Sequence, residues 1–463
     1  RAPPTTPPPP PPPSTPPPVT LPPPHHPPPP PPPRPAPPPP GAPHEPVADR
    51  ADRLRLLAAR LRADAPVLAA LITTEMGKPI TQAAAELEKC ALTCDYYADR
   101  VADLLRPEAV DVFPESGQIR VRPLGVLLAI MPWNYPFWQV FRSMLPALAI
   151  GNTVLLKHAD NVTGCAVAVQ RLFDEVCGTG VLTSVVLPPD RIGPLIDDAR
   201  IAAVAFTGSN RVGAIVGARA GAAVKKVVLE LGGSDPFIVL SDADIAVAAA
   251  AAVRSRFLNV GQSCIAAKRI IVEQRVFPDF TDAMVAELDK LVVGDPMSPG
   301  TDIGPMARAD LRDELRRQLT ATLAAGGTVL TGGAADSGPG AWFPPTIVTV
   351  PDTYAVAFQE ETFGPLGAVL PVASAAAALT AANASAYGLS CSIWGADLGR
   401  VQQLADRVAA GSVFVNRISE SDPRLPVGGV KASGHGRELS SYGATEFANI
   451  QAVRTASSAR SSR

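Results

Sequence analysis

The sequence predicts an α/β fold with two α/β domains, and two observations point to it. Short runs of valine, isoleucine and leucine alternate with segments that space their apolar residues as helices do. Runs this apolar are typical of parallel strands that are buried on both faces and joined by crossover helices. A second set of such runs spans residues 269–416, so a chain of 463 residues divides economically into two domains.

Helices and strands can be placed along the chain from this periodicity. Residues 49–76 have helical spacing until Gly77 and Pro79 end the run, and a second helix is expected from Thr81 to about Leu105. The segment Phe137–Leu148 is also expected to be helical. Strands are expected at residues 126–130, 153–157, 203–207, 226–231, 237–240, 269–272, 328–331, 367–372 and 411–416.

The composition is that of an ordinary globular protein and argues against several classes of partner. The chain is 46% hydrophobic and 18% charged, with a formal net charge of −2. A nucleic-acid-binding protein usually carries a basic face, so we expect no nucleic-acid partner. No apolar run reaches the roughly 18 residues of a spanning helix, and the opening residues lack the apolar core of a signal peptide. We therefore expect no membrane contact and a cytoplasmic location.

The six cysteines are too few and too irregularly spaced for a disulfide framework. Cys90 and Cys94 stand one helical turn apart, which is compatible with a metal pair, but no second cysteine pair lies nearby. We expect small buried thiols and no metal site.

Residues 1–46 form a proline-rich segment that holds more than half of the 53 prolines. Such a segment lacks backbone donors and apolar side chains for a core, so polyproline II or disorder is expected. It can be a ligand for proline-binding modules, but a solvated tail or a translation artefact is the simpler interpretation. We expect no catalytic residue in it.

Two local clusters carry a reactive side chain. Cys264 ends the string Gly-Gln-Ser-Cys, where a glycine-bearing turn can expose the sulfur and direct backbone N–H groups at an oxyanion. Glu230 lies between two leucines at a strand end, where burial would raise its pKa. Taken alone, a buried structural cysteine and a solvent-exposed edge glutamate are the simpler interpretations of these residues.

Two further clusters offer polar groups to a ligand. Asn134 lies between Pro132 and Pro136, which fix the backbone around an amide that can donate to an oxyanion, although a structural turn also explains the prolines. The turn Gly208-Ser209 joins a strand end to a helical stretch, as phosphate-binding turns do. That signal is weak by itself, because the G-x-G-x-x-G fingerprint is absent.

In combination and order, these clusters resemble the aldehyde dehydrogenase superfamily from about residue 50 to the C-terminus. Three longer strings, at residues 229–240, 261–269 and 421–439, resemble the short succinate-semialdehyde dehydrogenases. The matching motifs are Pro132-Trp133-Asn134, Lys157-His158-Ala159-Asp160, Phe206-Thr207-Gly208-Ser209, Glu230-Leu231-Gly232-Gly233, Gly261-Gln262-Ser263-Cys264 and Glu360-Glu361-Thr362-Phe363-Gly364-Pro365.

The resemblance implies oxidation of succinate semialdehyde to succinate with NAD or NADP. Cys264 would add to the aldehyde to form a thiohemiacetal, and Asn134 with the Cys264 backbone N–H would hold its oxyanion. Glu230 would be the general base that hydrolyses the resulting thioester. The cofactor-binding residues implied by the resemblance are Trp133, Lys157, His158, Ala159, Asp160, Gly208, Ser209, Leu231, Glu361 and Phe363.

Arg142 is the residue expected to select the substrate. Many relatives place an aromatic residue there, whereas the succinate-semialdehyde branch places arginine, which can grip a carboxylate with two parallel hydrogen bonds. Ser421 would supply a hydroxyl to the same carboxylate. The alternative for Arg142 is a surface salt bridge.

The sequence departs from the branch pattern at several positions. Asp160 stands where NADP-preferring relatives have serine, and a carboxylate there accepts ribose hydrogen bonds and repels a 2′-phosphate. We therefore expect a slight preference for NAD. A proline tract replaces the usual strand-bearing N-terminal segment, which puts the stability of the cofactor domain in question. Val427 and His435 replace aromatic residues near the substrate entrance.

The resemblance also implies an architecture of two Rossmann-like α/β domains and a small β flap for oligomerisation. The cofactor domain would comprise residues 47–111 and 123–229, and the catalytic domain residues 230–430. Residues 112–122 and 440–456 would form the flap, with strands at Val112–Val121 and Phe447–Arg454, and a homodimer or homotetramer is expected. Two alternatives to the main function are an aldehyde dehydrogenase for another small aldehyde and a non-catalytic scaffold with a proline-rich interaction tail.

Overall fold

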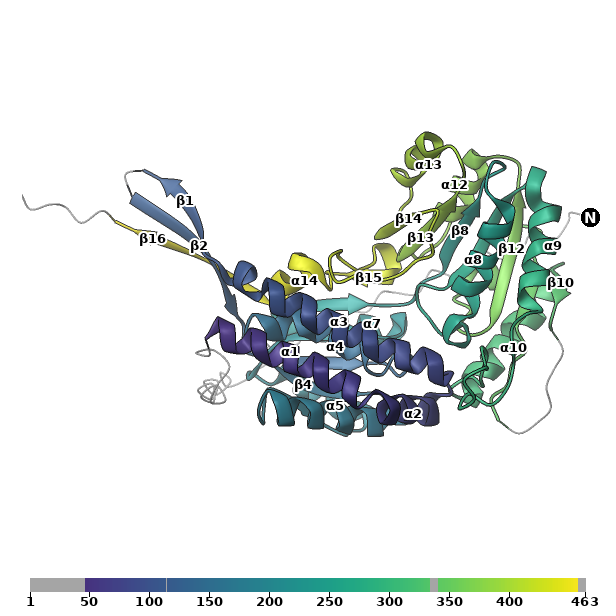
Figure 1. The fold of residues 1–463 in the computed structure, drawn as a ribbon. Coiled ribbons are helices and arrows are strands. Elements are labelled where there is room, and N and C mark those ends of the chain that lie inside the picture. Colours follow the sequence, from purple (N-terminus) through teal and green to yellow (C-terminus); the bar gives the residue numbers. More distant parts are fainter. Residues whose placement is uncertain (1–45, 114, 334–339, 457–463) are drawn as a thin grey trace, which may run out of the picture. The chain divides into compact units, whose positions relative to one another are not determined.

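The structure is a computed structural model that describes residues 46–113, 115–333 and 340–456. Within these ranges the strands form a six-stranded, a seven-stranded and a three-stranded sheet, and helices pack on the two larger ones (Figure 1). The α/β class predicted from the sequence is confirmed. The prediction for the proline-rich segment lies almost wholly outside the described residues.

The six-stranded sheet has the order β15-β7-β6-β3-β4-β5, and its strands β3 to β7 run parallel. Strand β3 lies between β4 and β6. The chain adds β4 and β5 on one side of β3 and then β6 and β7 on the other, so the strand order reverses at β3. Helices α1, α3, α4 and α5 cover one face, and α6 and α7 cover the other. The strands are β3 (Val126–Met131), β4 (Thr153–His158), β5 (Leu182–Ser184), β6 (Ile201–Thr207), β7 (Lys226–Glu230) and β15 (Gly434–His435).

The helical run predicted over residues 49–76 consists of two helices. Asp64 ends the first with φ −90° and ψ 0°, and Pro66 lies at the start of the second, where its missing N–H breaks no helical hydrogen bond. The predicted helices near 81–105 and 137–148 are confirmed. The helices of this part are α1 (Val47–Ala63), α2 (Ala65–Met76), α3 (Ile80–Leu105), α4 (Trp138–Ala149), α5 (Thr163–Val176), α6 (Ile192–Asp197) and α7 (Asn210–Ala222).

The seven-stranded sheet has the order β10-β11-β12-β9-β8-β13-β14, and only the β10–β11 pair is antiparallel. The strands are β8 (Asp235–Val239), β9 (Ala267–Glu273), β10 (Thr328–Thr331), β11 (Thr346–Thr349), β12 (Leu366–Val372), β13 (Ser390–Trp394) and β14 (Ser412–Val415). The helices are α8 (Ile245–Phe257), α9 (Phe277–Leu288), α10 (Ala309–Ala324), α11 (Val356–Gln359), α12 (Ala375–Asn383) and α13 (Leu398–Ala405). Every strand predicted in this region is present, and β11 and β13 are additional.

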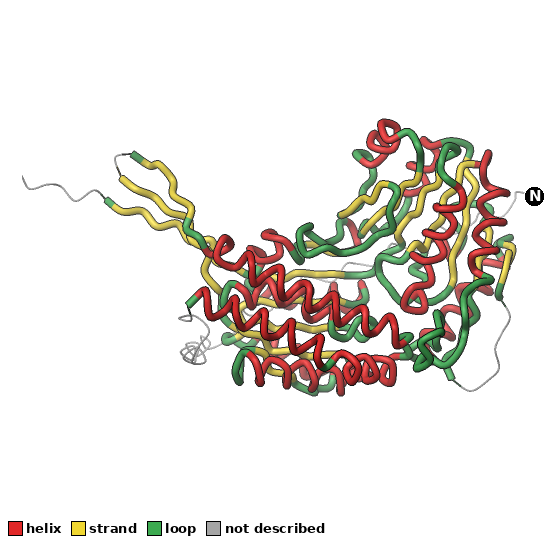
Figure 2. The backbone as a smooth tube through the Cα atoms, in the orientation of Figure 1, coloured by secondary structure: helices red, strands yellow, loops and turns green. Residues whose placement is uncertain are grey.

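The three-stranded sheet extends from the six-stranded part as an antiparallel ribbon (Figure 2). It consists of β1 (Glu108–Val112), β2 (Glu115–Pro123) and β16 (Ala448–Thr455), with β2 in the centre. The single strand predicted at 112–121 is therefore wrong in its start, because the chain turns at Phe113 and forms a hairpin. Residues 440–446, which the prediction places in the flap ahead of its second strand, form helix α14 (Ser440–Glu446), and the strand predicted at Phe447–Arg454 corresponds to β16.

A buried ion pair joins α3 to the start of α4. The Lys78 ammonium contacts the Glu86 carboxylate, and both side chains are fully buried. The other Glu86 oxygen accepts hydrogen bonds from the backbone N–H groups of Phe137 and Trp138, each at 2.9 Å. Because these donors lie at the N-terminus of α4, one carboxylate holds both the lysine and the helix.

We predict that Glu86→Gln lowers the free energy of unfolding by about 3 kcal/mol, because it leaves the Lys78 charge buried without its counterion. The measurement is chemical denaturation of the full chain. Glu88→Gln, on the same helix, is the matched control: Glu88 pairs with Arg62 at the surface, where such a pair contributes less than about 1 kcal/mol. Equal losses in the two variants would contradict the structural role of the buried pair.

Candidate active site

The predicted motifs meet at one edge of the six-stranded sheet. The Pro132–Pro136 turn follows β3, Asp160 lies just beyond β4, Gly208 follows β6, and Glu230 ends β7. Parallel strands bring their carboxyl ends to the same edge, and ligands of open α/β sheets bind where the strand order reverses. The fold therefore gathers segments that lie about a hundred residues apart in the sequence.

Cys264 follows a strained turn. The one-turn 3₁₀ segment Leu258–Gly261 contains Asn259 and Val260 at φ 57°, a conformation that a β-branched residue rarely adopts. The Asn259 side-chain amide donates to the backbone carbonyl of Asn134 at 2.8 Å, which ties this turn to the one after β3. Such strain costs about 1–3 kcal/mol per residue and is typical of functional sites.

Two buried cations bind backbone carbonyls of residues 261–264, the cysteine turn. The Lys268 ammonium donates to the carbonyls of Ser263 and Cys264 at 2.7 and 2.8 Å. The Arg256 guanidinium donates to the carbonyl of Gly261 at 2.8 Å. Sequence reasoning assigned no role to either cation. Lys268 lies at the start of the apolar strand β9 (Ala267–Glu273), which was a signal that it binds a group in the interior, whereas Arg256 lies in the last turn of α8.

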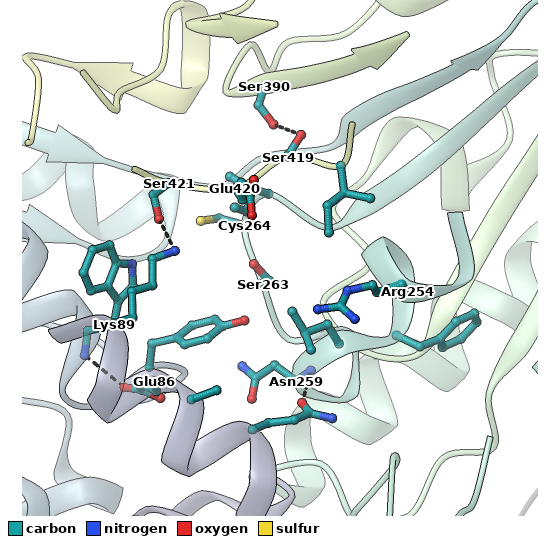
Figure 3. A pocket seen from close by; sticks show the side chains of 18 of the residues that line it. Glu86, Lys89, Arg254, Asn259, Ser263, Cys264, Ser390, Ser419, Glu420 and Ser421 are labelled. Carbon is teal, nitrogen blue, oxygen red and sulfur yellow. Dashed lines mark hydrogen bonds between the residues drawn. The ribbon is translucent and has the colours of Figure 1, made fainter. Parts of the chain in front are cut away.

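Cys264 faces a cavity of about 720 Å³. Ser263, Ser421, Lys89 and Arg142 also line it, and Figure 3 shows several of these side chains around the cysteine. Cys264 is partly exposed, whereas the other five cysteines are buried. The partial exposure of Cys264 at the cavity argues against a purely structural role, and Cys90 and Cys94 are the buried thiols that the sequence predicts.

The Cys264 thiol is protonated at neutral pH. Burial raises its pKa to about 11, and the positive charges of Arg142 and Lys268 act in the opposite direction. A neighbouring base or a higher pH is therefore needed to form the nucleophilic thiolate.

Glu230 is only 2% exposed, so the interpretation as a surface glutamate is wrong. Neither carboxylate oxygen has a well-formed hydrogen bond to a described residue, and an Arg142 terminal nitrogen lies 3.8 Å from one of them. Burial, and then the charge of Glu438, raise the Glu230 pKa to about 8. A carboxylate with this pKa is suited to act as a general base near neutral pH.

Arg142 forms a buried salt bridge rather than the surface one considered from the sequence. Its Nε donates to the carboxylate of Glu438, a residue that sequence reasoning did not single out. One terminal nitrogen of Arg142 has no hydrogen-bond partner among the described residues. A two-pronged grip that uses Nε would first require Glu438 to move.

Asn134 and Ser421 also make specific contacts. The Asn134 amide donates to the backbone carbonyl of Gln262 at 3.0 Å, so it lies against the cysteine turn and is not yet free to bind an oxyanion. The Ser421 hydroxyl accepts a hydrogen bond of 2.8 Å from Lys89, another cavity residue that the sequence analysis did not single out.

The turn after β6 has the features of a phosphate site. Ser209 caps α7, its hydroxyl accepting from the Val212 N–H at 3.5 Å. A Cβ on Gly208 would lie 2.6 Å from the Phe206 ring, so this position requires glycine. The buried Thr207 hydroxyl lacks a hydrogen-bond partner among described residues, which fits a turn built for a ligand.

The remaining predicted cofactor residues fall on either side of this turn. Lys157 donates to the Asp160 carboxylate at 2.7 Å, and Asp160 remains 65% exposed. Glu361 accepts from the Gly233 N–H at 3.0 Å, next to the end of β7. Trp133 and Phe363 pack edge to face, with ring centroids 5.8 Å apart. An exposed carboxylate, a half-buried one and a glycine turn on one edge fit a dinucleotide with its two riboses.

The His158 side chain is buried, and both of its ring nitrogens contact backbone groups. Its Nδ1 accepts from the Ala159 N–H at 2.9 Å and its Nε2 lies 2.8 Å from the Pro136 carbonyl, so the neutral Nε2–H tautomer fits. Burial lowers its pKa to about 4. The side chains of His158 and Leu231 are buried, so a cofactor would meet their backbone atoms.

The described residues contain no cluster of three or more His, Cys, Asp or Glu side chains suited to a metal ion. Within those same ranges, every helix is too short or too polar to cross a bilayer.

We predict that the rate of Cys264 alkylation by iodoacetamide rises about tenfold per pH unit between about pH 7 and about pH 9, because each unit raises the thiolate fraction of a high-pKa thiol by that factor. Peptide-level mass spectrometry measures the rate, with the five buried cysteines as internal controls. A rate already at its plateau at pH 7 would show that the resting sulfur is a thiolate.

Comparison with known proteins identifies the family and supports the fold. Residues 40–453 match the aldehyde dehydrogenase family. A succinate semialdehyde dehydrogenase [NAD(P)+] of Escherichia coli K12 is 48% identical over 405 residues, covering 87% of this chain and 88% of that protein. A probable succinate-semialdehyde dehydrogenase [NADP(+)] of Synechocystis is 44% identical, covering 89% and 90%. The structure of a Streptococcus pyogenes succinic semialdehyde dehydrogenase with NADP+ superposes with a TM-score of 0.87 at 33% identity, covering 89% and 91%. The chain belongs to the aldehyde dehydrogenase family.

Proposed function

We propose that the protein oxidises succinate semialdehyde to succinate with NAD or NADP. Two relatives that are 48% and 44% identical carry this activity in their names. The observation that carries the proposal is the accessible Cys264 sulfur in a cavity that also contains the cations Arg142 and Lys89. A thiol can capture an aldehyde, and buried cations favour a substrate with a carboxylate at its far end. The interpretation as a non-catalytic scaffold has no support in this arrangement.

In the first half of the reaction, the Cys264 thiol releases its proton to solvent, and its sulfur bonds to the aldehyde carbon and forms a thiohemiacetal. Its oxyanion is stabilised by the Cys264 backbone N–H and by the Asn134 amide, once that amide turns away from the Gln262 carbonyl. When bound, the nicotinamide supplies the hydride acceptor that leaves the substrate as a thioester on Cys264. Arg142 lowers the pKa of the sulfur by its charge.

In the second half, Glu230 removes a proton from the water that attacks the thioester. The carboxylate is competent only when ionised, and its raised pKa means that the competent fraction grows as the pH rises toward about 8. The burial that raises the pKa also makes the carboxylate a stronger base than a surface glutamate.

The cofactor is proposed to lie along the edge where β3, β4, β6 and β7 end. Lys157 and Asp160 would meet the adenine ribose, Gly208 and Ser209 the pyrophosphate, and Glu361 the nicotinamide ribose, with Trp133, Ala159, Leu231 and Phe363 completing the site. Lys157 already neutralises part of the Asp160 charge. The remaining Asp160 charge repels a 2′-phosphate, so we propose that NAD is preferred. Because the pairing with Lys157 weakens this repulsion, we propose that NADP is also used.

The three-stranded sheet supports an oligomeric state. Strand β16 lies at one edge with unpaired backbone groups, as strands that join a neighbouring subunit do. We propose that the protein forms a homodimer or homotetramer. A cytoplasmic location stays a prediction.

We predict that Cys264→Ser lowers kcat at least about 10³-fold, since the hydroxyl is a far weaker nucleophile. Glu230→Gln is expected to give one rapid turnover of cofactor reduction and then stall, because the thioester forms but is not hydrolysed. Stopped-flow absorbance and mass spectrometry of the succinyl adduct on Cys264 measure the two effects. Multiple turnovers without any Cys264 adduct in Glu230→Gln would contradict the assignment.

We predict that Asp160→Ser raises the ratio of kcat/KM with NADP to kcat/KM with NAD by about tenfold, because a carboxylate that repels the 2′-phosphate is removed. Steady-state kinetics with both cofactors measure the ratio. Asp190→Ser, at an exposed position in a 3₁₀ turn, is the control for loss of a surface charge. A wild-type preference for NADP of about tenfold or more would contradict the proposed NAD preference.

A further inference from the structure

We propose that Lys89, held in place by Ser421, is a second determinant of substrate specificity and binds the far carboxylate of the substrate beside Arg142. The inference rests on the proposed function and adds to it a residue of α3 that lies outside every motif of the sequence analysis.

The Lys89 ammonium lies at the cavity. Its Nζ donates to the Ser421 hydroxyl at 2.8 Å and lies 4.6 Å from the centre of the Trp138 ring. Lys89, Ser421 and Trp138 line the same cavity as Cys264. Figure 3 shows the Lys89–Ser421 hydrogen bond in the part of the cavity that also contains Cys264. An ammonium has three donors, so two remain for a ligand.

The Lys89 charge forms no salt bridge with a described carboxylate. The two carboxylates whose charges act on the Lys89 pKa are bound elsewhere: Glu420 pairs with Arg417, and Asp422 pairs with Arg424 at 2.5 Å. A partly buried ammonium without a counterion is unfavourable, and burial accordingly lowers the Lys89 pKa. An anionic group that enters the cavity relieves this cost.

Arg142 differs from Lys89 in this respect. Its Nε is bound to Glu438, and Glu230 lies within 3.8 Å of a terminal nitrogen. The Glu438 carboxylate therefore already offsets the single guanidinium charge. The two cations also lie close enough for Arg142 to lower the Lys89 pKa. A substrate carboxylate between them would meet the charge of Lys89 and the terminal nitrogen of Arg142 that lies 3.8 Å from Glu230 without a hydrogen bond to it.

The test compares succinate semialdehyde with butanal, an uncharged aldehyde of the same length. In Lys89→Met the stem over Trp138 is kept and the charge is lost. We expect KM for succinate semialdehyde to rise at least about tenfold, with kcat and the KM for butanal changed less than about threefold. Lys89→Arg, which keeps the charge, should recover most of the loss. Lys290→Met is the matched control, because Lys290 also lines the cavity but pairs with Glu287 at the surface.

The outcomes separate the inference from the proposed function. If Lys89→Met raises KM equally for both aldehydes, or if Lys89→Arg is as impaired as Lys89→Met, Lys89 has a structural role and the inference is wrong. Thermal denaturation of each variant identifies a general loss of stability, which would affect both aldehydes alike. If the wild-type protein uses butanal as efficiently as succinate semialdehyde, the proposed substrate itself is wrong.

Discussion

One guanidinium group shared by two buried carboxylates is the constraint on which the site depends. Arg142 contacts Glu438 directly and lies 3.8 Å from Glu230, and all three side chains are at most 4% exposed. In a low-dielectric interior, a single positive charge cannot fully stabilise two negative ones. The second carboxylate therefore tends to hold its proton, and Glu230 becomes a group that can release and accept a proton near neutral pH.

The same constraint links the base to the nucleophile. The Arg142 charge lowers the pKa of the Cys264 thiol, and an ionised Glu230 raises it. Proton release from one group therefore makes release from the other harder, so the pair tends to carry one negative charge rather than two. This arrangement is chemically apt for two successive steps, since the first needs a thiolate and the second needs a carboxylate.

The fold holds these groups by long-range contacts. The parallel strands bring four turns to one edge, and the strained turn before Cys264 is fixed by Asn259, Lys268 and Arg256.

Much of this arrangement could be predicted from the sequence, because strands, helices and reactive residues belong to local strings. Cys264, Glu230 and Arg142 were found in this way. Glu438 could not be, because it meets Arg142 across 296 positions.

Other differences have local causes. Strand β13 was not predicted because serines interrupt its apolar run, and the Ser390 hydroxyl is bound by a distant partner, Asp235. The β1–β2 hairpin was read as one strand because its turn is short and both strands have few buried residues. Lys89 lies on a helix whose other face forms the core, so its sequence context marks it as a surface lysine.

The most direct test of this account is the protonation state of Glu230. Infrared difference spectra of wild type and Glu230→Gln, recorded from about pH 6 to about pH 10, report the carbonyl stretch of a protonated carboxyl group. The account predicts a Glu230-dependent band at the acidic end that disappears with a midpoint near 8. Absence of that band at the acidic end would show that Glu230 is ionised throughout, and would contradict the buried charge balance proposed for the site.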